Sequence, residues 1–460
     1  MINRLLGRAS CLAAALSAAL LPPLPALAQG RPISLIRDAE IEATIREYAN
    51  PIFTAAGLDA SAIKVHLVED DRINAFAAPG MNMFLNTGLL MNADTPNQVI
   101  GVIAHETGHI ADGHLVRIQE ELRSATIQSI VALLAGIGAG VATGNAGIGA
   151  GAATLGQGIA TRNLLQYSRV QEASADQAGM KFLDETHQSA RGMLEFFQKL
   201  EGEAFLLATN QDPYLQTHPL TTDRIEAVQQ HVDNSPYSNA KDVPDLIVLH
   251  QRILAKLKGY LWPFDRVLQV YPPSDLSVPA RYARAIALYR VSRQKEALQL
   301  MQSLLEEQPN DAFFLEQTGQ ILFQNGRLAE ALPFYQRAAD IRPSEALLRQ
   351  ELGQVQIETE DPRYVKPAVA NLRFASQMES NDPEVWRLLA IAYGRDDQLA
   401  MSSLAQAEQA MAAGNKREAR AQARRALKGL PSGSIGWLRA DDIVSAAGGE
   451  DEQSDEGAMP

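Results

Sequence analysis

Residues 99–109 read VIGVIAHETGH, an apolar run that ends in two histidines four positions apart. On an α-helix, positions i and i+4 share one face, so the imidazoles of His105 and His109 can reach a single metal ion. Glu106 is turned far enough from them to meet a water bound to that ion. The spacing suits zinc and predicts a hydrolytic metal site on a helix. Two partly exposed helix histidines without a metal are the alternative.

A third ligand must come from elsewhere, because catalytic zinc typically takes three protein groups and leaves one position open. His114 comes one residue too early for the extended pattern with a third histidine, so we expect it to be structural or to support a ligand. Farther along, Glu172 and Asp176 are four apart on a predicted helix. One carboxylate can bind the metal while the other accepts the free N–H of a ligand imidazole. An exposed acidic helix face is the alternative.

The residues before this motif predict a mixed α/β beginning. An amphipathic helix is expected around 39–48, a strand over 64–68 and a hairpin-like stretch over 73–90 that turns at Pro79-Gly80. Helices are expected from Thr95 onward.

From about residue 244 to residue 437 the strand signals fade and helical pairs repeat. One set of three residues recurs with identical internal spacing: Gly326, Ala331 and Pro343 reappear as Gly414, Ala419 and Pro431. Ala297 and Pro309 precede the first set by 34 residues, which is the tetratricopeptide (TPR) period. Pro383 follows Pro343 after 40 residues and marks an irregular unit. The pattern predicts an all-α superhelix with a concave surface for protein segments. A non-repetitive helical bundle is the alternative.

Composition excludes several functions. Lys and Arg total 41 against 54 for Asp and Glu, a net charge of -13 that would repel nucleic acid. Cys11 is the one cysteine, so neither a disulfide framework nor cysteine catalysis is expected.

The first residues read as a secretory signal. Arg4 and Arg8 precede an uncharged apolar run over 9–21, and residues 26–28 read ALA, the pattern of a signal-peptidase site. We therefore expect cleavage after residue 28 and a periplasmic location of the Gram-negative type. A membrane anchor is the alternative, but the run is shorter than a bilayer span. The expected organisation is a signal peptide over 1–28, a zinc metalloprotease domain over 29–240, a TPR domain over 241–440 and a disordered acidic tail over 441–460.

The motif at 105–109, the hairpin before it and the pair Glu172 and Asp176 after it resemble the zinc peptidase family that includes HtpX and the CAAX prenyl endopeptidases. The resemblance implies a gluzincin-like α+β fold, mostly helical with a small β-sheet. It implies one Zn²⁺ per chain on His105, His109 and Glu172, with Glu106 as the catalytic residue and Asp176 supporting a ligand. The signal peptide and the repeats place the likeness among exported members concerned with outer-membrane protein assembly.

Two further features follow from this resemblance. His218 and Arg224 match a His-Pro motif of the family, which implies that His218 is a fourth ligand in the resting enzyme or an oxyanion stabiliser in the working one. A loop histidine that caps a helix is the alternative. We assign the strand that pairs with an extended substrate to the segment Asn74, Ala75, Phe76, Ala77 and Ala78.

The stretch between Arg123 and Arg162 contains no charged residue and is rich in Gly and Ala. Its most apolar part is short and interrupted by glycines, so we favour a loop or helical lid over the metal cleft, with peripheral membrane contact through 124–161. Insertion into the bilayer is the alternative.

These features predict an exported zinc endopeptidase that degrades misfolded or stalled outer-membrane and periplasmic proteins and also acts as a chaperone in their assembly. Its expected partners are unfolded or misassembled clients and the outer-membrane protein assembly machinery. Two alternatives stay open: a mainly non-proteolytic TPR scaffold with a latent zinc site, and a membrane-associated processing protease.

Overall fold

The computed structural model describes residues 34–78, 80–114, 169–207, 214 and 218–448. The expected signal peptide, the charge-free segment 124–161 and the end of the acidic tail lie outside these residues. The elements before residue 235 are, in chain order, β1 (Leu35–Ile36), α2 (Ala39–Ala55), β2 (Lys64–Val68), β3 (Ala75–Ala78), β4 (Asn82–Asn86), α3 (Thr87–Asn92), α4 (Pro96–Ala111), a helix over 169–185, α7 (Arg191–Leu207) and α9 (Thr222–Asn234).

The sheet has the strand order β1-β2-β4-β3, with β2 parallel and β3 antiparallel to β4. Gly80 and Met81, both with positive φ, lie between β3 and β4, and the antiparallel pairing of the two strands confirms the predicted hairpin. The hairpin ends at Asn86, because residues 87–90, which the prediction included, belong to α3. One face of the sheet is buried in the core through Ala75, Met83 and Leu85. The strand over 64–68 also lies where the sequence predicted it.

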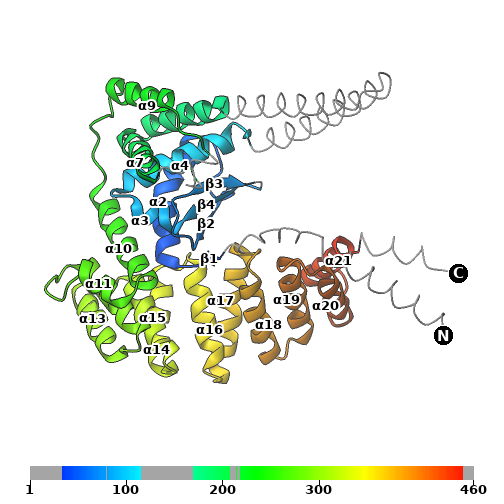
Figure 1. Ribbon diagram of the computed structural model, residues 1–460. Coiled ribbons are helices and arrows are strands. Elements are labelled where there is room, and N and C mark those ends of the chain that lie inside the picture. Colours follow the sequence, from blue (N-terminus) through cyan, green and yellow to red (C-terminus); the bar gives the residue numbers. More distant parts are fainter. Residues whose placement is uncertain (1–33, 79, 115–168, 208–213, 215–217, 449–460) are drawn as a thin grey trace, which may run out of the picture. The chain divides into compact units, whose positions relative to one another are not determined.

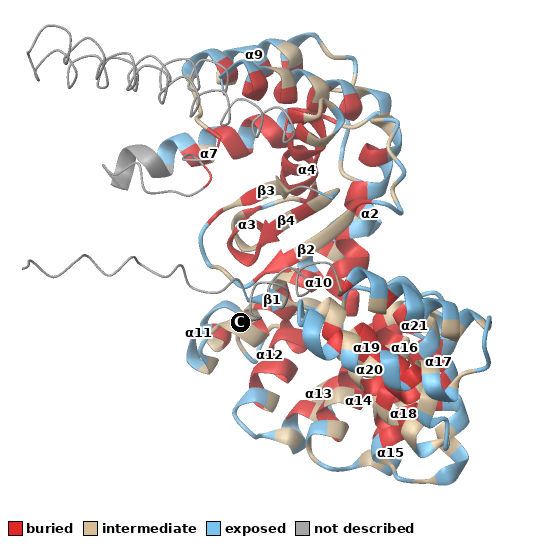
Figure 2. Ribbon diagram, turned by 90° about the vertical axis from the view of Figure 1, so that its right-hand side faces the viewer, coloured by how far each residue is buried: buried red, intermediate tan, exposed pale blue. Residues whose placement is uncertain are grey.

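Helix α4 is capped by the Thr95 side chain, which accepts from the Gln98 N–H, and Pro96 occupies its first turn. These are the helix-start signals that the sequence carries. The helix is buried along nearly its whole length, including its polar residues, whereas α9 exposes its outer face (Figure 2). A helix covered on all sides fixes its side chains in place, so α4 is a rigid support for the motif at 105–109.

Two glycines let the helix over 169–185 approach α4. A Cβ on Gly108 would lie 2.7 Å from the Ala175 carbonyl oxygen, and one on Gly179 would lie 3.1 Å from the carbonyl carbon of Ala104. Any larger side chain would push the two backbones apart. Gly108, which stands inside the 105–109 motif, therefore also sets the distance across which Glu172 must reach.

The second half of the described chain is entirely helical. It comprises α10 (Pro244–Leu261), α11 (Phe264–Val270), α12 (Val278–Arg290), α13 (Gln294–Glu307), α14 (Ala312–Gln324), α15 (Leu328–Ile341), α16 (Ala346–Glu358), the short 3-10 helix η1 (Pro362–Tyr364), α17 (Val365–Met378), α18 (Pro383–Arg395), α19 (Leu399–Ala412), α20 (Lys416–Gly429) and α21 (Ile435–Ala446). From α12 onward these helices follow one another as antiparallel pairs (Figure 1).

The repeat residues found in the sequence occupy equivalent places in these pairs. Ala297, Ala331 and Ala419 are fully buried where the helices pack, and Gly326 and Gly414 adopt positive φ in the turns between helices. The irregular unit before Pro383 contains η1, which accommodates its additional residues. Helix α21 continues to Ala446, so it includes residues 441–446, which the sequence analysis had assigned to the acidic tail.

Helix α2 extends beyond the predicted 39–48 and takes part in two cores. Ile41 and Ile45 pack in the core that contains the sheet and α4, whereas Ala39 and Ala43 pack with residues of α12, α14 and α16. Asp38 caps the helix by accepting from the Ile41 N–H.

Buried charged side chains lie where α2 packs against the repeat helices. Glu40 Oε1 lies 2.7 Å from Arg252, and Glu40 Oε2 accepts from the Tyr282 hydroxyl at 2.8 Å. Lys256, which is 1% exposed, lies 2.8 Å from Asp38 and 3.4 Å from Glu316. Because unpaired buried charges are costly, this network makes the pairing of α2 with the repeat helices specific.

Candidate metal centre

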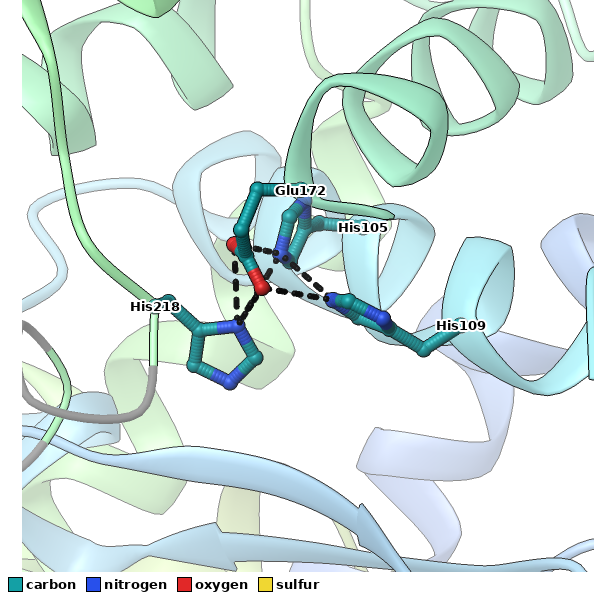
Figure 3. A group of neighbouring side chains, drawn as sticks. All are labelled: His105, His109, Glu172 and His218. Carbon is teal, nitrogen blue, oxygen red and sulfur yellow. Dashed lines mark hydrogen bonds and ion pairs between the residues drawn. The ribbon is translucent and has the colours of Figure 1, made fainter. Parts of the chain in front are cut away.

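Four buried side chains from three segments of the chain point toward one another: His105, His109, Glu172 and His218 (Figure 3). His105 and His109 come from α4, and Glu172 comes from the helix over 169–185. His218 lies just before α9. Its backbone N–H donates to the carbonyl of Tyr214 at 2.7 Å. The structure therefore brings together the residues that the sequence analysis assigned to the metal.

The donor atoms are spaced as ligands of one ion would be. His105 Nε2 lies 3.2 Å from His109 Nε2, 3.3 Å from Glu172 Oε2 and 3.3 Å from His218 Nδ1. Glu172 Oε1 lies 3.3 Å from His109 Nε2 and 3.1 Å from His218 Nδ1. A tetrahedral ion with ligand bonds of about 2.0–2.1 Å has ligand-to-ligand distances of about 3.3 Å. Three imidazole nitrogens and one carboxylate therefore fit a tetrahedral metal site.

A second set of residues contacts these donors. Asp176 Oδ1 lies 2.8 Å from His105 Nδ1, the nitrogen that faces away from the other donors. The Arg224 guanidinium donates to both oxygens of Asp176, at 2.6 and 2.8 Å, and its Nη1 lies 3.0 Å from Glu172 Oε2. On the other ligand, His109 Nδ1 lies 3.0 Å from His114 Nδ1. Contacts of this kind fix the tautomer and ring orientation of a ligand histidine.

The electrostatics of the centre favour a cation. Burial would raise the pKa of Glu172, but hydrogen bonds to His105, His109 and His218 hold that pKa far below its usual range. Burial would also raise the pKa of Asp176, which hydrogen bonds from Arg224 and His105 lower. Burial would lower the pKa of His105, but Asp176 and Glu172 raise it to about 10. The two carboxylates are therefore ionised, and they attract positive charge to the imidazole nitrogens.

Glu106 lies beside the four donors and contacts the edge of the sheet. Its Oε2 accepts the backbone N–H of Ala77 in β3 at 3.1 Å. Its Oε1 lies 3.4 Å from His218 Nε2, and within the described part of the chain neither of these two buried atoms has a hydrogen-bond partner. A buried carboxylate oxygen in this position can take up a proton from a water molecule next to the metal donors.

The sequence analysis missed Tyr214. Its ring lies 4.8 Å from that of His218, tilted by 30°, and is almost fully buried. Burial raises the pKa of the Tyr214 hydroxyl well above its usual value, and the nearby Glu106 carboxylate adds to this rise. The tyrosine is therefore neutral and supports the His218 ring. The one signal in the sequence is its place four residues before His218.

The geometry can be compared with known proteins. Residues 35–232 match peptidase family M48, and residues 280–346 match a tetratricopeptide repeat family. This first part of the chain is a peptidase family M48 domain. The M48 domain contains every donor of the metal centre, and the TPR match covers α12 to α15. The sequence resemblance and the expected order of peptidase and repeats are thus confirmed.

The curated relatives of this chain are proteases, and each is similar to only part of it. A beta-barrel assembly-enhancing protease of Yersinia pestis is 26% identical over 61% of this chain and 58% of its own length. The protein of the same name in Escherichia coli is 24% identical over 59% of this chain and 57% of its own length. The metalloprotease LoiP of Escherichia coli is 28% identical over 40% of this chain and 71% of its own length. The match therefore spans less than two thirds of either assembly-enhancing protease.

Within the described residues, the helices are too short or too polar to cross a membrane. The expected lid or membrane contact over 124–161 lies outside those residues and stays a prediction.

Proposed function

We propose that the chain is an exported zinc-dependent endopeptidase that acts in the periplasm on outer-membrane proteins whose assembly has stalled or failed. The observation that carries this proposal is the convergence of His105, His109 and Glu172 next to Glu106, which in turn contacts a strand at the edge of the sheet. The names of the curated relatives support β-barrel proteins as the substrate class.

Zinc fits the donors better than the other common divalent ions. Mg²⁺ and Ca²⁺ take oxygen ligands at higher coordination numbers, whereas imidazole nitrogens and one carboxylate in a tetrahedron suit zinc. The charge also fits, because among the described residues the carboxylates of Glu106, Glu172 and Asp176 face one guanidinium, that of Arg224. The raised pKa of His105 shows that Asp176 and Glu172 already favour a positive charge at this imidazole, and a bound cation would supply that charge.

Different residues of the chain have different roles in the proposed hydrolysis. A zinc ion in this site would supply Lewis acidity to the attacking water and to the scissile carbonyl. Glu106 accepts the proton of that water at Oε1 and passes it to the departing amine nitrogen. Asp176 and Arg224 keep His105 and Glu172 in the geometry that the reaction needs. Strand β3 holds the substrate backbone beside Glu106 through main-chain hydrogen bonds.

His218 is the part of the site that regulates access in this proposal. Its Nδ1 lies within 3.3 Å of His105 Nε2 and 3.1 Å of Glu172 Oε1, which are the spacings of a fourth ligand. A fourth protein ligand occupies the position that water needs, so this arrangement corresponds to a resting enzyme. When the segment before α9 moves, the same imidazole can donate to the developing oxyanion.

The closed form of the site also favours a second function. If His218 stays in place, the repeats still hold unfolded clients on their concave surface, and the protein acts as a chaperone with a latent peptidase. The peptidase needs the Glu106 carboxylate, whereas the chaperone does not.

The substitution Glu106→Gln tests the proposal. The purified variant should keep its zinc, because Glu106 is not among the donors, and should lose cleavage of an unassembled β-barrel protein by at least about 100-fold. Glu226→Gln, at an exposed glutamate of α9, is the matched control. Zinc content is measured by elemental analysis and cleavage by gel electrophoresis. Equal cleavage by Glu106→Gln and wild type would rule out the mechanism. Client protection that survives in Glu106→Gln would favour the chaperone.

A further inference from the structure

Three aromatic rings form a row across the sheet beside the metal centre. Phe76 of β3 stands directly opposite Phe84 of β4, which stands opposite His66 of β2. The Phe76 and Phe84 rings stack with centroids 4.8 Å apart at 11°, and the Phe84 and His66 rings with centroids 4.7 Å apart at 22°. His66 Nε2 lies 2.9 Å from Asn82 Oδ1, which fixes that ring. All three rings are half-exposed, on the face opposite the buried Ala75.

The row of rings ends at Phe76 in β3, the strand that contacts the Glu106 carboxylate. Among the described strands β3 is an edge of the sheet. Asn86 N–H donates to the carbonyl of Asn74, so Asn74 is a hydrogen-bonded partner on the β4 side. Backbone groups alternate in an antiparallel pair, so those of Phe76 also face β4, and those of Ala75 and Ala77 point outward. The bond from the Ala77 N–H to Glu106 confirms this direction.

These alternating directions determine where a substrate side chain would go. A substrate strand on the outer edge of β3 would form its main-chain hydrogen bonds with Ala75 and with the Ala77 carbonyl, because the Ala77 N–H already donates to Glu106. The substrate residue opposite Phe76 would then place its side chain on the same face as the Phe76 ring, with the two Cβ atoms about 4.5–5.5 Å apart. The row of stacked rings would gain a fourth member from the substrate.

We propose that Phe76, supported by Phe84 and His66, is a specificity subsite for one aromatic or large aliphatic side chain of the substrate. This inference rests on the proposed peptidase function and names the substrate class for the same site: an extended segment with an apolar side chain opposite Phe76. An aromatic side chain gains both burial and ring contact there, whereas a charged one loses hydration without a partner. Extended segments with apolar side chains at alternate positions are typical of β-barrel strands.

The subsite is tested with fluorogenic decapeptides that are identical except at one position. Each position around the cleaved bond carries Phe, Leu, Ala or Asp in turn. The wild-type protein should prefer Phe or Leu over Ala at one position by about three- to tenfold in kcat/KM. Phe76→Ala should abolish the preference at that position, because it removes the ring that the larger side chain contacts. Phe76→Leu should keep the preference for apolar residues and reduce the advantage of Phe over Leu.

Val65→Ala is the matched control, because Val65 is a half-buried residue of the same sheet. Val65 and its partner Met83 both lie on the face opposite the three aromatic rings. The Val65→Ala protein should keep the preference. Binding of the uncleaved peptides to Glu106→Gln protein, measured by fluorescence anisotropy, gives a second readout that needs no turnover. A Phe76→Ala protein that loses activity equally on all peptides, or a Val65→Ala protein that loses the same preference, would overturn the subsite.

The two proposals can fail separately. If the wild-type protein cleaves none of the peptides, the peptidase function fails, and the anisotropy experiment alone decides the subsite. Peptides with Phe that bind no more tightly than those with Ala would then overturn it. If the peptides are cleaved without a preference at any position, only the subsite fails.

Discussion

Asp176 Oδ1 lies 2.8 Å from His105 Nδ1, while Arg224 donates to both oxygens of the same carboxylate. One aspartate thus connects an imidazole of the candidate metal centre to a buried guanidinium. This relationship makes the orientation of His105 depend on a residue 71 positions farther along the chain, and its removal should loosen the metal.

We expect Asp176→Asn to weaken zinc binding by about 10- to 100-fold, because an amide orients the imidazole less firmly than a carboxylate. Competition with a chromogenic chelator measures the affinity directly. Asp223→Asn, at an exposed aspartate of α9, is the control and should bind zinc as wild type does. Unchanged zinc affinity in Asp176→Asn would show that the contact with His105 is not needed.

His218→Ala distinguishes the two roles of that histidine. A fourth ligand that blocks the water position predicts faster proteolysis in the variant. An oxyanion stabiliser predicts a fall of about 100-fold or more in kcat. Steady-state cleavage of one peptide measures both outcomes, and zinc content shows that the three remaining donors still hold the ion. Proteolysis equal to wild type would remove both roles.

Gly108→Ala should destabilise the fold by about 1–3 kcal/mol, since its Cβ would meet the Ala175 carbonyl at 2.7 Å and force the two helices apart. Gly202→Ala is the matched control. Gly202 also lies in a helix, has nothing within 4 Å of an added Cβ, and should gain up to about 1 kcal/mol from the better helix former. Urea unfolding gives both values. A Gly108→Ala protein as stable as wild type would contradict the close contact.

Stability should depend on pH through Glu316. Burial raises the pKa of this carboxyl from 4.5 to about 7, and Asp38 and Glu40 add to the rise although Lys256 opposes it. A folded-state pKa above the unfolded one stabilises the protein fully below about pH 4.5, and this stability is lost as pH rises toward 7 and beyond.

Glu316→Gln removes this loss, so its free energy of unfolding should fall less than that of wild type between pH 5 and pH 7.5, by on the order of 2 kcal/mol. Glu351 of α16 also faces the cluster and stays in both proteins. Urea titrations at several pH values measure the difference, with the exposed Glu306→Gln as control. Parallel pH profiles for wild type and Glu316→Gln would show that Glu316 ionises normally.

Local patterns predicted local structure well. His105 and His109 are one helical turn apart, so their shared face follows from the sequence, and the turn before β4 and the repeat spacing are equally local. Glu172 and His218 could not be placed by spacing, because the contact depends on how three segments pack. The need for a third ligand pointed to the pair Glu172 and Asp176, but only the resemblance to a family assigned Glu172 to the metal and joined His218 to the site. Gly108 had no assigned role, although it sets the helix crossing.

The contacts of α2 with the repeats were not predictable. Nothing in the sequence pairs Glu40 with Arg252, since the two are more than 200 residues apart and neither belongs to a motif. Tyr214 was missed for a similar reason, as its place beside His218 comes from the tertiary fold. The helix over 39–48 was recognised, but its two packing faces became visible only with both cores in place.

The double packing of α2 makes the peptidase and the repeats one cooperative unit. Ala39 and Ala43 complete the core of the repeat helices, while Ile41 and Ile45 belong to the core of the M48 domain. A protein cut near residue 240 would leave Ala39, Ala43 and the Glu40 carboxylate open to water in one piece. In the other piece Arg252 would lose Glu40 and Lys256 would lose Asp38, although Asp311 and Glu316 stay beside them. Calorimetry of the intact molecule should therefore record a single melting transition rather than two.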